Sequence, residues 1–133
     1  MLTCLALVAF NVASLGDIPK MSSDLEAEAR ALATVNEISS DFVARIETFS
    51  ADAQRLSASL GNAGVGQDMP CIFQGIASDA HARATDFVAA DTQAAQDTAF
   101  MNFRVLMEDA AMLAPLAAGA AAERADERNI ALR

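Results

Sequence analysis

The sequence predicts an all-α protein, in which an antiparallel two-helix hairpin is completed by one or two shorter helices into a small bundle with coiled-coil-like packing. Glycine and proline gather in a few places and leave two long intervals without either helix breaker. Within both intervals, apolar residues recur mostly at spacings of three, four and seven, which is the period of a helical seam. A chain of 133 residues is also long enough for one domain with its own core.

The first long helix is predicted from about residue 23 to residue 60. Ser22-Ser23-Asp24 follows Pro19 and offers an N-cap for it. A straight helix of this length would extend ~57 Å at 1.5 Å per residue, so a kink is expected at Ser39-Ser40-Asp41. The residues predicted to form its seam are Leu25, Leu32, Val35, Phe42, Ile46, Phe49, Ala53, Leu56 and Leu60.

The glycine-rich segment 61–66 predicts the turn of the hairpin, because glycine favours positive φ and weakens a helix. Pro70 suits the first turn of a second long helix starting near residue 69. The seam of that helix changes phase near Asp91-Thr92. Its predicted members are Phe73, Ala77, Ala80, Ala84, Phe87, Ala95, Ala99, Phe103, Leu106, Ala110 and Leu113.

Small residues dominate the first half of this second seam. If the hairpin turns near residue 65, Phe42 and Phe49 should lie opposite the alanines between 80 and 90, and the two helices should approach closely. Pro115 is predicted to end the second helix, because its ring clashes with the preceding turn. The expected organisation is therefore an apolar segment 1–16, a hairpin 22–114, and a short alanine-rich helix with a frayed tail over 115–133.

Residues 1–16 are uncharged and mostly apolar, but they are fewer than the ~20 residues that a spanning helix needs. No stable membrane span is predicted. A signal peptide with a cleavage context at Val12-Ala13-Ser14 fits better, although no basic residue precedes the apolar run. A periplasmic or secreted bacterial protein is therefore expected, and a cytoplasmic one is the alternative if the segment is a retained helix.

The charge of the chain argues against nucleic acid as a partner. Eighteen acidic residues against nine basic ones give a net charge of −9, which repels a phosphate backbone. The acidic residues are spread along the chain and form no separate tail. The charge is interpreted as conferring solubility.

The second helix is also apolar on a face that the predicted core does not use. Ala94, Met101, Val105 and Met112 form an apolar stripe roughly opposite the predicted core seam. Such a stripe requires cover, since contiguous exposed apolar patches are uncommon on soluble monomers. The cover could come from the residues after Pro115, from segment 2–15, or from another chain. A homo-oligomer or a protein partner is the prediction in the last case.

The sequence contains no recognisable catalytic, cofactor or metal motif, so neither an enzyme nor a cofactor is predicted. Two single residues remain as candidates for reactivity. Cys71 lies in the first turn of the second helix, where the helix dipole lowers a thiol pKa, but a buried packing role is the ordinary outcome for cysteine. Cys4 and Cys71 could also pair in an oxidising compartment.

His81 is the second candidate, because an exposed histidine on a bundle helix is what histidine phosphotransfer domains use. Ala80-His81 resembles the start of that family's motif, but the Leu, Lys and Gly positions of the motif are not matched. By its angle on the helix, His81 should lie half-buried at the edge of the core and hydrogen-bond a neighbour.

The best interpretation of the sequence is a small exported bacterial helical protein that acts through protein interaction or a structural role. A ligand-binding or sensory bundle is the first alternative, with Phe and Met side chains of residues 100–113 lining a pocket. A histidine phosphotransfer-like domain is the second alternative.

Overall fold

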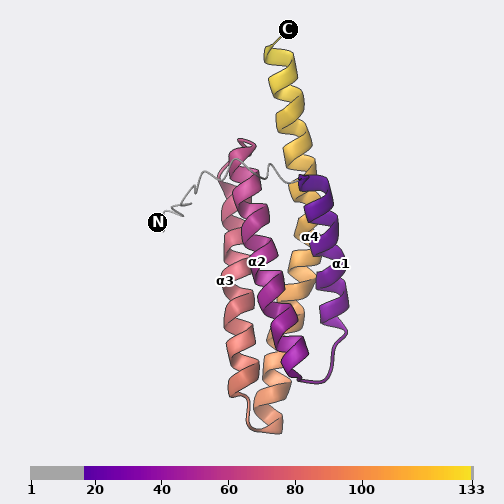
Figure 1. The fold of residues 1–133 in the computed structure, drawn as a ribbon, viewed down its shortest axis with the longest axis vertical. Helices are drawn as coiled ribbons and strands as arrows, with labels where there is room; N and C mark the ends of the chain where they lie inside the picture. The colour runs from indigo at the N-terminus through magenta and orange to yellow at the C-terminus, as the bar shows by residue number, and fades with distance from the viewer. Residues whose placement is uncertain (1–16, 133) are drawn as a thin grey trace.

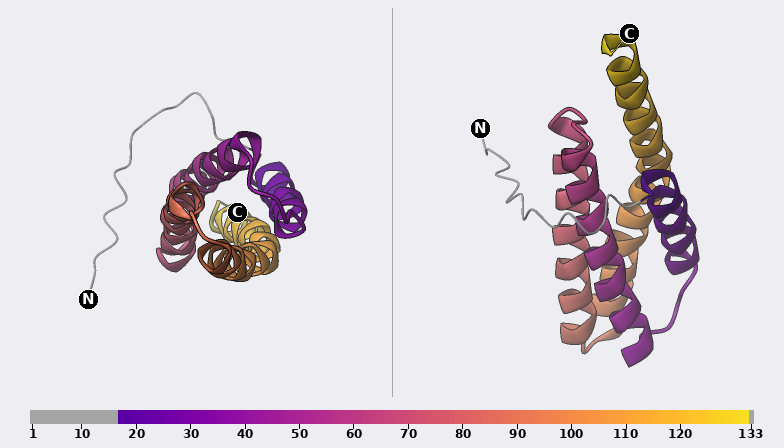
Figure 2. Two further views of the ribbon diagram at one scale, coloured as in Figure 1. Left: turned by 90° about the horizontal axis from the view of Figure 1, so that it is seen from below. Right: turned by 45° about the horizontal axis from the view of Figure 1, so that its top comes forward.

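The computed structural model describes residues 17–132, which form four α-helices in an up-and-down bundle (Figure 1). The helices are α1 (Ile18–Ala33), α2 (Ser40–Asn62), α3 (Asp68–Ala89) and α4 (Gln93–Ala131). Helix α2 packs most extensively on α3, and α1 packs most extensively on α4. Smaller contacts join α1 to α2 and α3 to α4, so the helices form a ring around one core (Figure 2). The predicted all-α bundle is confirmed.

The two long helices expected from the sequence are each divided into two, which corrects the predicted hairpin 22–114. The first break follows Ala33, and Ser39 caps α2 by accepting a hydrogen bond from the Phe42 amide at 3.0 Å. The second break follows Ala89, and Thr92 caps α4 by accepting from the Ala95 amide at 3.1 Å. Both breaks lie where the sequence indicated a kink or a change of phase. Each is a full chain reversal, because the capping side chain satisfies the first amides of a new helix.

The start of α1 also differs from the prediction. Asp17 is the N-cap, and its carboxylate accepts a hydrogen bond from the Lys20 amide at 3.2 Å. Pro19 lies within the first turn, where its missing amide proton costs little. Ser22, one of the three residues expected to offer the N-cap, is instead buried.

Helix α4 continues through Pro115, so the prediction that this proline ends the helix is wrong, and so is that of a separate helix over 115–133. Ala114 and Ala117, on either side of the proline, are fully buried, while Pro115 itself is exposed. Packing against α1 therefore stabilises the helix at Pro115, where the amide proton for one helical hydrogen bond is missing. Beyond residue 121 the described part of α4 is exposed and extends past the other helices (Figure 1).

The predicted seams form most of the core. Every member of the first seam is buried except Val35, which is half-buried, and Ala95, Leu106 and Leu113 are the half-buried members of the second. Four buried rings gather where the two linkers lie, at the lower end of the bundle in Figure 1: Phe42, Phe87, Phe100 and Phe103. Phe42 contacts the other three, with ring centroids 5.1 to 5.9 Å away. This cluster joins the start of α2 to the end of α3 and the start of α4.

Polar contacts fix the register of α2 against α3. The Ser50 hydroxyl donates to the Ala77 carbonyl at 2.6 Å, and the Ser57 hydroxyl donates to the Pro70 carbonyl at 2.6 Å. Phe42 accordingly lies beside Phe87, at the far end of the alanine-rich stretch. At the opposite end of the pair, Gly64 adopts a φ of +77° in the turn between α2 and α3.

Candidate interaction face on helix α4

The apolar stripe predicted on the second helix lies on the solvent side of α4. The exposed fractions are 60% for Met101, 56% for Val105 and 64% for Met112, and Ala94 is exposed as well. Leu116 extends the same stripe by one more turn and is 54% exposed. At 3.6 residues per turn, these five side chains lie within an arc of about 60° on the helix surface. We call these five residues the α4 stripe.

The opposite face of α4 is buried. Phe103, Met107 and Ala110 are fully inaccessible to solvent, and Ala99, Ala114 and Ala117 line the same side. The helix therefore carries one apolar face that builds the core and a second that faces solvent. The sequence indicated both faces, but it missed Leu116 because Pro115 was expected to end the helix just before it.

One of the three expected sources of cover, the residues after Pro115, can be compared with the structure. The residues after Pro115 do not fold back, because α4 runs on to Ala131. Segment 2–15 lies outside the described residues. Within residues 17–132, the large members of the α4 stripe remain more than half exposed. The intramolecular explanation of the stripe is thus not supported by this part of the chain.

Few polar side chains lie beside the stripe, and they carry charges of both signs. Arg104 and Glu108 lie on one flank and are exposed. The Arg104 guanidinium carbon lies 5.3 Å from the centroid of the Phe100 ring, a cation–π contact. Asn102 and Asp109, also exposed, lie on the other flank. The stripe is therefore an apolar strip with acidic and basic side chains along one edge and with Asn102 and Asp109 along the other.

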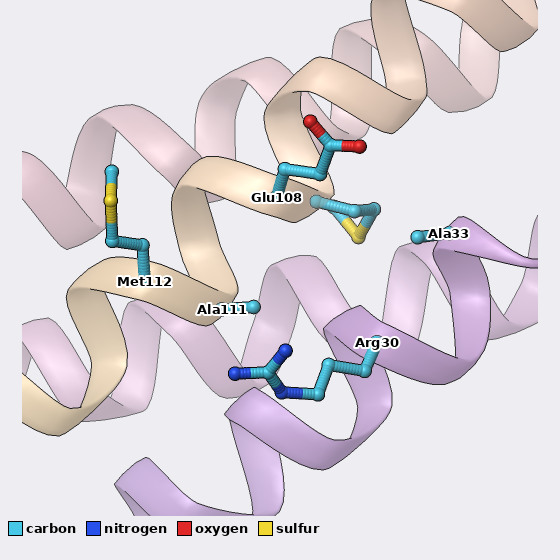
Figure 3. Close-up of a pocket in the computed structure, with 6 residues that line it drawn as sticks. Arg30, Ala33, Glu108, Ala111 and Met112 are labelled. Atoms are coloured by element: carbon cyan, nitrogen blue, oxygen red, sulfur yellow. The ribbon is translucent and has the colours of Figure 1, made fainter.

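A hollow next to the stripe lies between α4 and α1. Its volume is about 460 Å³, and it is lined by Arg30, Ala33, Met107, Glu108, Ala111 and Met112. Arg30 extends from α1 toward Ala111 on α4, whereas the carboxylate of Glu108 points away from Arg30 (Figure 3). The rings of Phe100 and Phe103 pack in the core instead of lining this hollow. The ligand-binding alternative stays a prediction.

The two candidate reactive residues lie far from the stripe along the chain, both on α3. His81 is exposed, and its Nδ1 lies 2.9 Å from a carboxylate oxygen of Glu47 on α2. The prediction of a hydrogen-bonded neighbour is met, whereas the half-buried position is not, since the His81 side chain is 68% exposed. Cys71 is half-buried in the first turn of α3, and its amide donates to the Gln67 carbonyl at 3.2 Å. Cys4 lies outside the described residues.

Neither residue belongs to a cluster of chemical groups. Over residues 17–132, no three His, Cys, Asp or Glu side chains come together in a way that could hold a metal ion. The structure places Cys71 near the start of α3 and His81 midway along it, so it does not bring them together. Each remains a single residue with its own local contacts.

Helix α4 also has the length and apolar composition of a membrane-crossing helix, a property that no other described helix shares. The same composition occurs in the core helices of soluble bundles. Here it arises because α4 is apolar both on the face that packs against α1 and α3 and on the stripe.

Comparison with protein-family models, with curated proteins and with solved structures finds no match to this chain.

Proposed function

We propose that this chain is a small exported bacterial helical protein that acts through protein interaction, and that the α4 stripe is its binding surface. The observation that carries the proposal is the exposure of Met101, Val105, Met112 and Leu116 along one continuous face of α4. Contiguous apolar surface of this kind is characteristic of binding sites, because leaving it in water is unfavourable. Methionine suits such a surface, since its flexible, polarizable side chain adapts to a partner.

Other features of the chain support a binding role over a catalytic one. The sequence carries no catalytic motif, and within residues 17–132 no three His, Cys, Asp or Glu side chains gather in a way that could hold a metal ion. The long bundle provides a rigid support for the stripe, because the opposite face of α4 is fixed by Phe103 and Met107 in the core. Export is proposed from the uncharged apolar segment 1–16, which lies outside the described residues.

Photo-crosslinking in living cells tests the binding surface. A photoreactive amino acid is placed at position 101 in the α4 stripe or at position 88 on α3. Val88 is the matched control, since it is 75% exposed but belongs to a different helix face. We expect a discrete crosslinked band from position 101 and none from position 88. Equal crosslinking from both positions, or none from position 101, contradicts the proposal.

A further inference from the structure

We propose that the partner bound by the α4 stripe is a second copy of this chain, and that two α4 helices pack antiparallel about a two-fold axis near Leu106. This inference rests on the proposed function, because it takes the stripe to be a binding surface. It adds the identity of the partner and the orientation of the pair. The order of apolar and charged residues along and beside the stripe supports both the partner and the orientation.

The apolar residues of the stripe are arranged for pairing with themselves. Met101 and Met112 lie almost equally far on either side of position 106, so an antiparallel pair brings Met101 of one copy beside Met112 of the other. Val105 lies next to the axis and therefore meets Val105 of the second copy. The same surface serves on both chains, as a closed two-fold dimer requires.

The charges beside the stripe complement one another in this orientation. In an antiparallel pair, the flanks that carry the same residues lie on the same side of the interface. Two residues that lie equally far from the axis, one before it and one after it along the chain, are then neighbours across the interface. Arg104 and Glu108 share one flank and lie equally far from position 106. Arg104 of each copy is then level with Glu108 of the other, which forms two symmetric ion pairs. Neither side chain has an ion-pair partner within residues 17–132.

The other flank is complementary in the same way. Asn102 and Asp109 lie nearly equally far from position 106, and both are exposed. The amide of Asn102 can therefore donate to the Asp109 carboxylate of the second copy. A parallel pair in register would instead bring the Arg104 and Glu108 flank of one copy beside the Asn102 and Asp109 flank of the other. Glu108 would then lie nearly level with Asp109 of the other copy, and these like charges repel. The order of charges thus selects the antiparallel arrangement.

The length of the stripe sets the strength expected of the dimer. From Ala94 to Leu116 the stripe extends ~33 Å at 1.5 Å per residue. One helix face of this length buries less than the ~800 Å² per partner of a standard interface, so micromolar association is expected. The net charge of −9 on each chain opposes association. Screening at ~0.15 M salt, where the Debye length is ~8 Å, reduces that repulsion.

Sedimentation equilibrium of the chain purified from its own cells, over a range of micromolar concentrations, tests the inference. We expect reversible dimerisation of the wild type. Val105→Glu should lower the association constant by about tenfold or more, because a carboxylate would be buried beside its counterpart at the axis. Val88→Glu makes the same change on exposed α3 and should leave dimerisation unchanged. Circular dichroism checks that each variant keeps its helix content.

Charge reversal tests the orientation. Arg104→Glu and Glu108→Arg should each weaken the dimer, because each places like charges opposite one another. The double variant restores opposite charges across the interface and should recover dimerisation. A monomeric wild type at all concentrations, a dimer indifferent to Val105→Glu, or a double variant that fails to recover would each overturn the inference.

The crosslinking experiment separates failure of this inference from failure of the proposed function. An adduct from position 101 with twice the mass of the chain supports the second copy. An adduct with a different protein overturns this inference while the stripe remains a binding surface. No adduct from position 101 overturns both.

Discussion

Phe42→Ala should lower the free energy of unfolding by about 3–5 kcal/mol, which is the usual cost of removing a buried ring from a core. Phe42 is 2% exposed, and its ring contacts Phe87, Phe100 and Phe103. Its loss leaves a cavity where α2, α3 and α4 meet, and the three remaining rings also lose their edge and stacking contacts. Chemical denaturation followed by far-ultraviolet circular dichroism measures the change.

Two variants control this experiment. Phe42→Leu keeps most of the side-chain volume and should cost clearly less than the alanine variant. Met101→Ala removes a large apolar side chain from the exposed α4 stripe and should change stability of the monomer by no more than about 0.5 kcal/mol. If Phe42→Ala were as mild as Met101→Ala, the aromatic cluster would not be part of the core.

Ala80→Leu should destabilise the bundle by about 1–3 kcal/mol, because it forces extra volume into a packed interior. Ala80 is fully buried on α3, between Ala77 and Ala84, which are also buried. Small side chains at these positions let α2 and α3 approach closely enough for the Ser50 hydroxyl to reach the Ala77 carbonyl at 2.6 Å. A leucine at position 80 pushes the helices apart and lengthens that hydrogen bond.

The matched control is Ala58→Leu, which makes the same change at an exposed position inside α2. Both alanine and leucine are good helix formers, so this control should alter stability only slightly. Thermal and chemical unfolding of the two variants give the comparison. Equal stability of Ala80→Leu and Ala58→Leu would mean that α2 and α3 do not pack as closely as described.

The periodicity of apolar residues was sufficient to predict the helical class and most of the core. It worked because core helices bury a seam at fixed spacing, and the seam members Ile46, Phe49 and Phe73 are indeed fully buried. Periodicity did not locate the chain reversals at Ser39 and Thr92. An N-cap residue can begin a new helix after a short linker, and no glycine or proline is needed beside it.

The continuation of α4 through Pro115 could not be predicted from local preference. Proline removes one amide and disfavours a helix interior, but tertiary packing can outweigh that cost. The burial of Ala114 and Ala117 supplies this packing, and only the position of α1 in the fold reveals it. The exposed position of His81 was missed for a related reason, since its angle relative to the core depends on how α3 packs against α2.

The α4 stripe was visible in the sequence, because Met101, Val105 and Met112 are apolar at helical spacing on a face away from the seam. Its exposure could not be predicted, since the sequence allowed the residues after Pro115 to cover it. The continuation of α4 to Ala131 removes that option for the described residues. The proposed pairing of the stripe with a second copy is tested by the charge-reversal variants above.

Oxidation of methionine by peroxide most directly tests the claim that α4 is apolar on two sides, one buried and one open to solvent. Met101 and Met112 are 60% and 64% exposed, whereas Met107, between them on the same helix, is fully buried. Thioether oxidation follows solvent exposure. In dilute, native protein, mass spectrometry of the oxidised peptides should find Met101 and Met112 converted rapidly and Met107 protected. Rapid oxidation of Met107, or protection of all three, would contradict this arrangement.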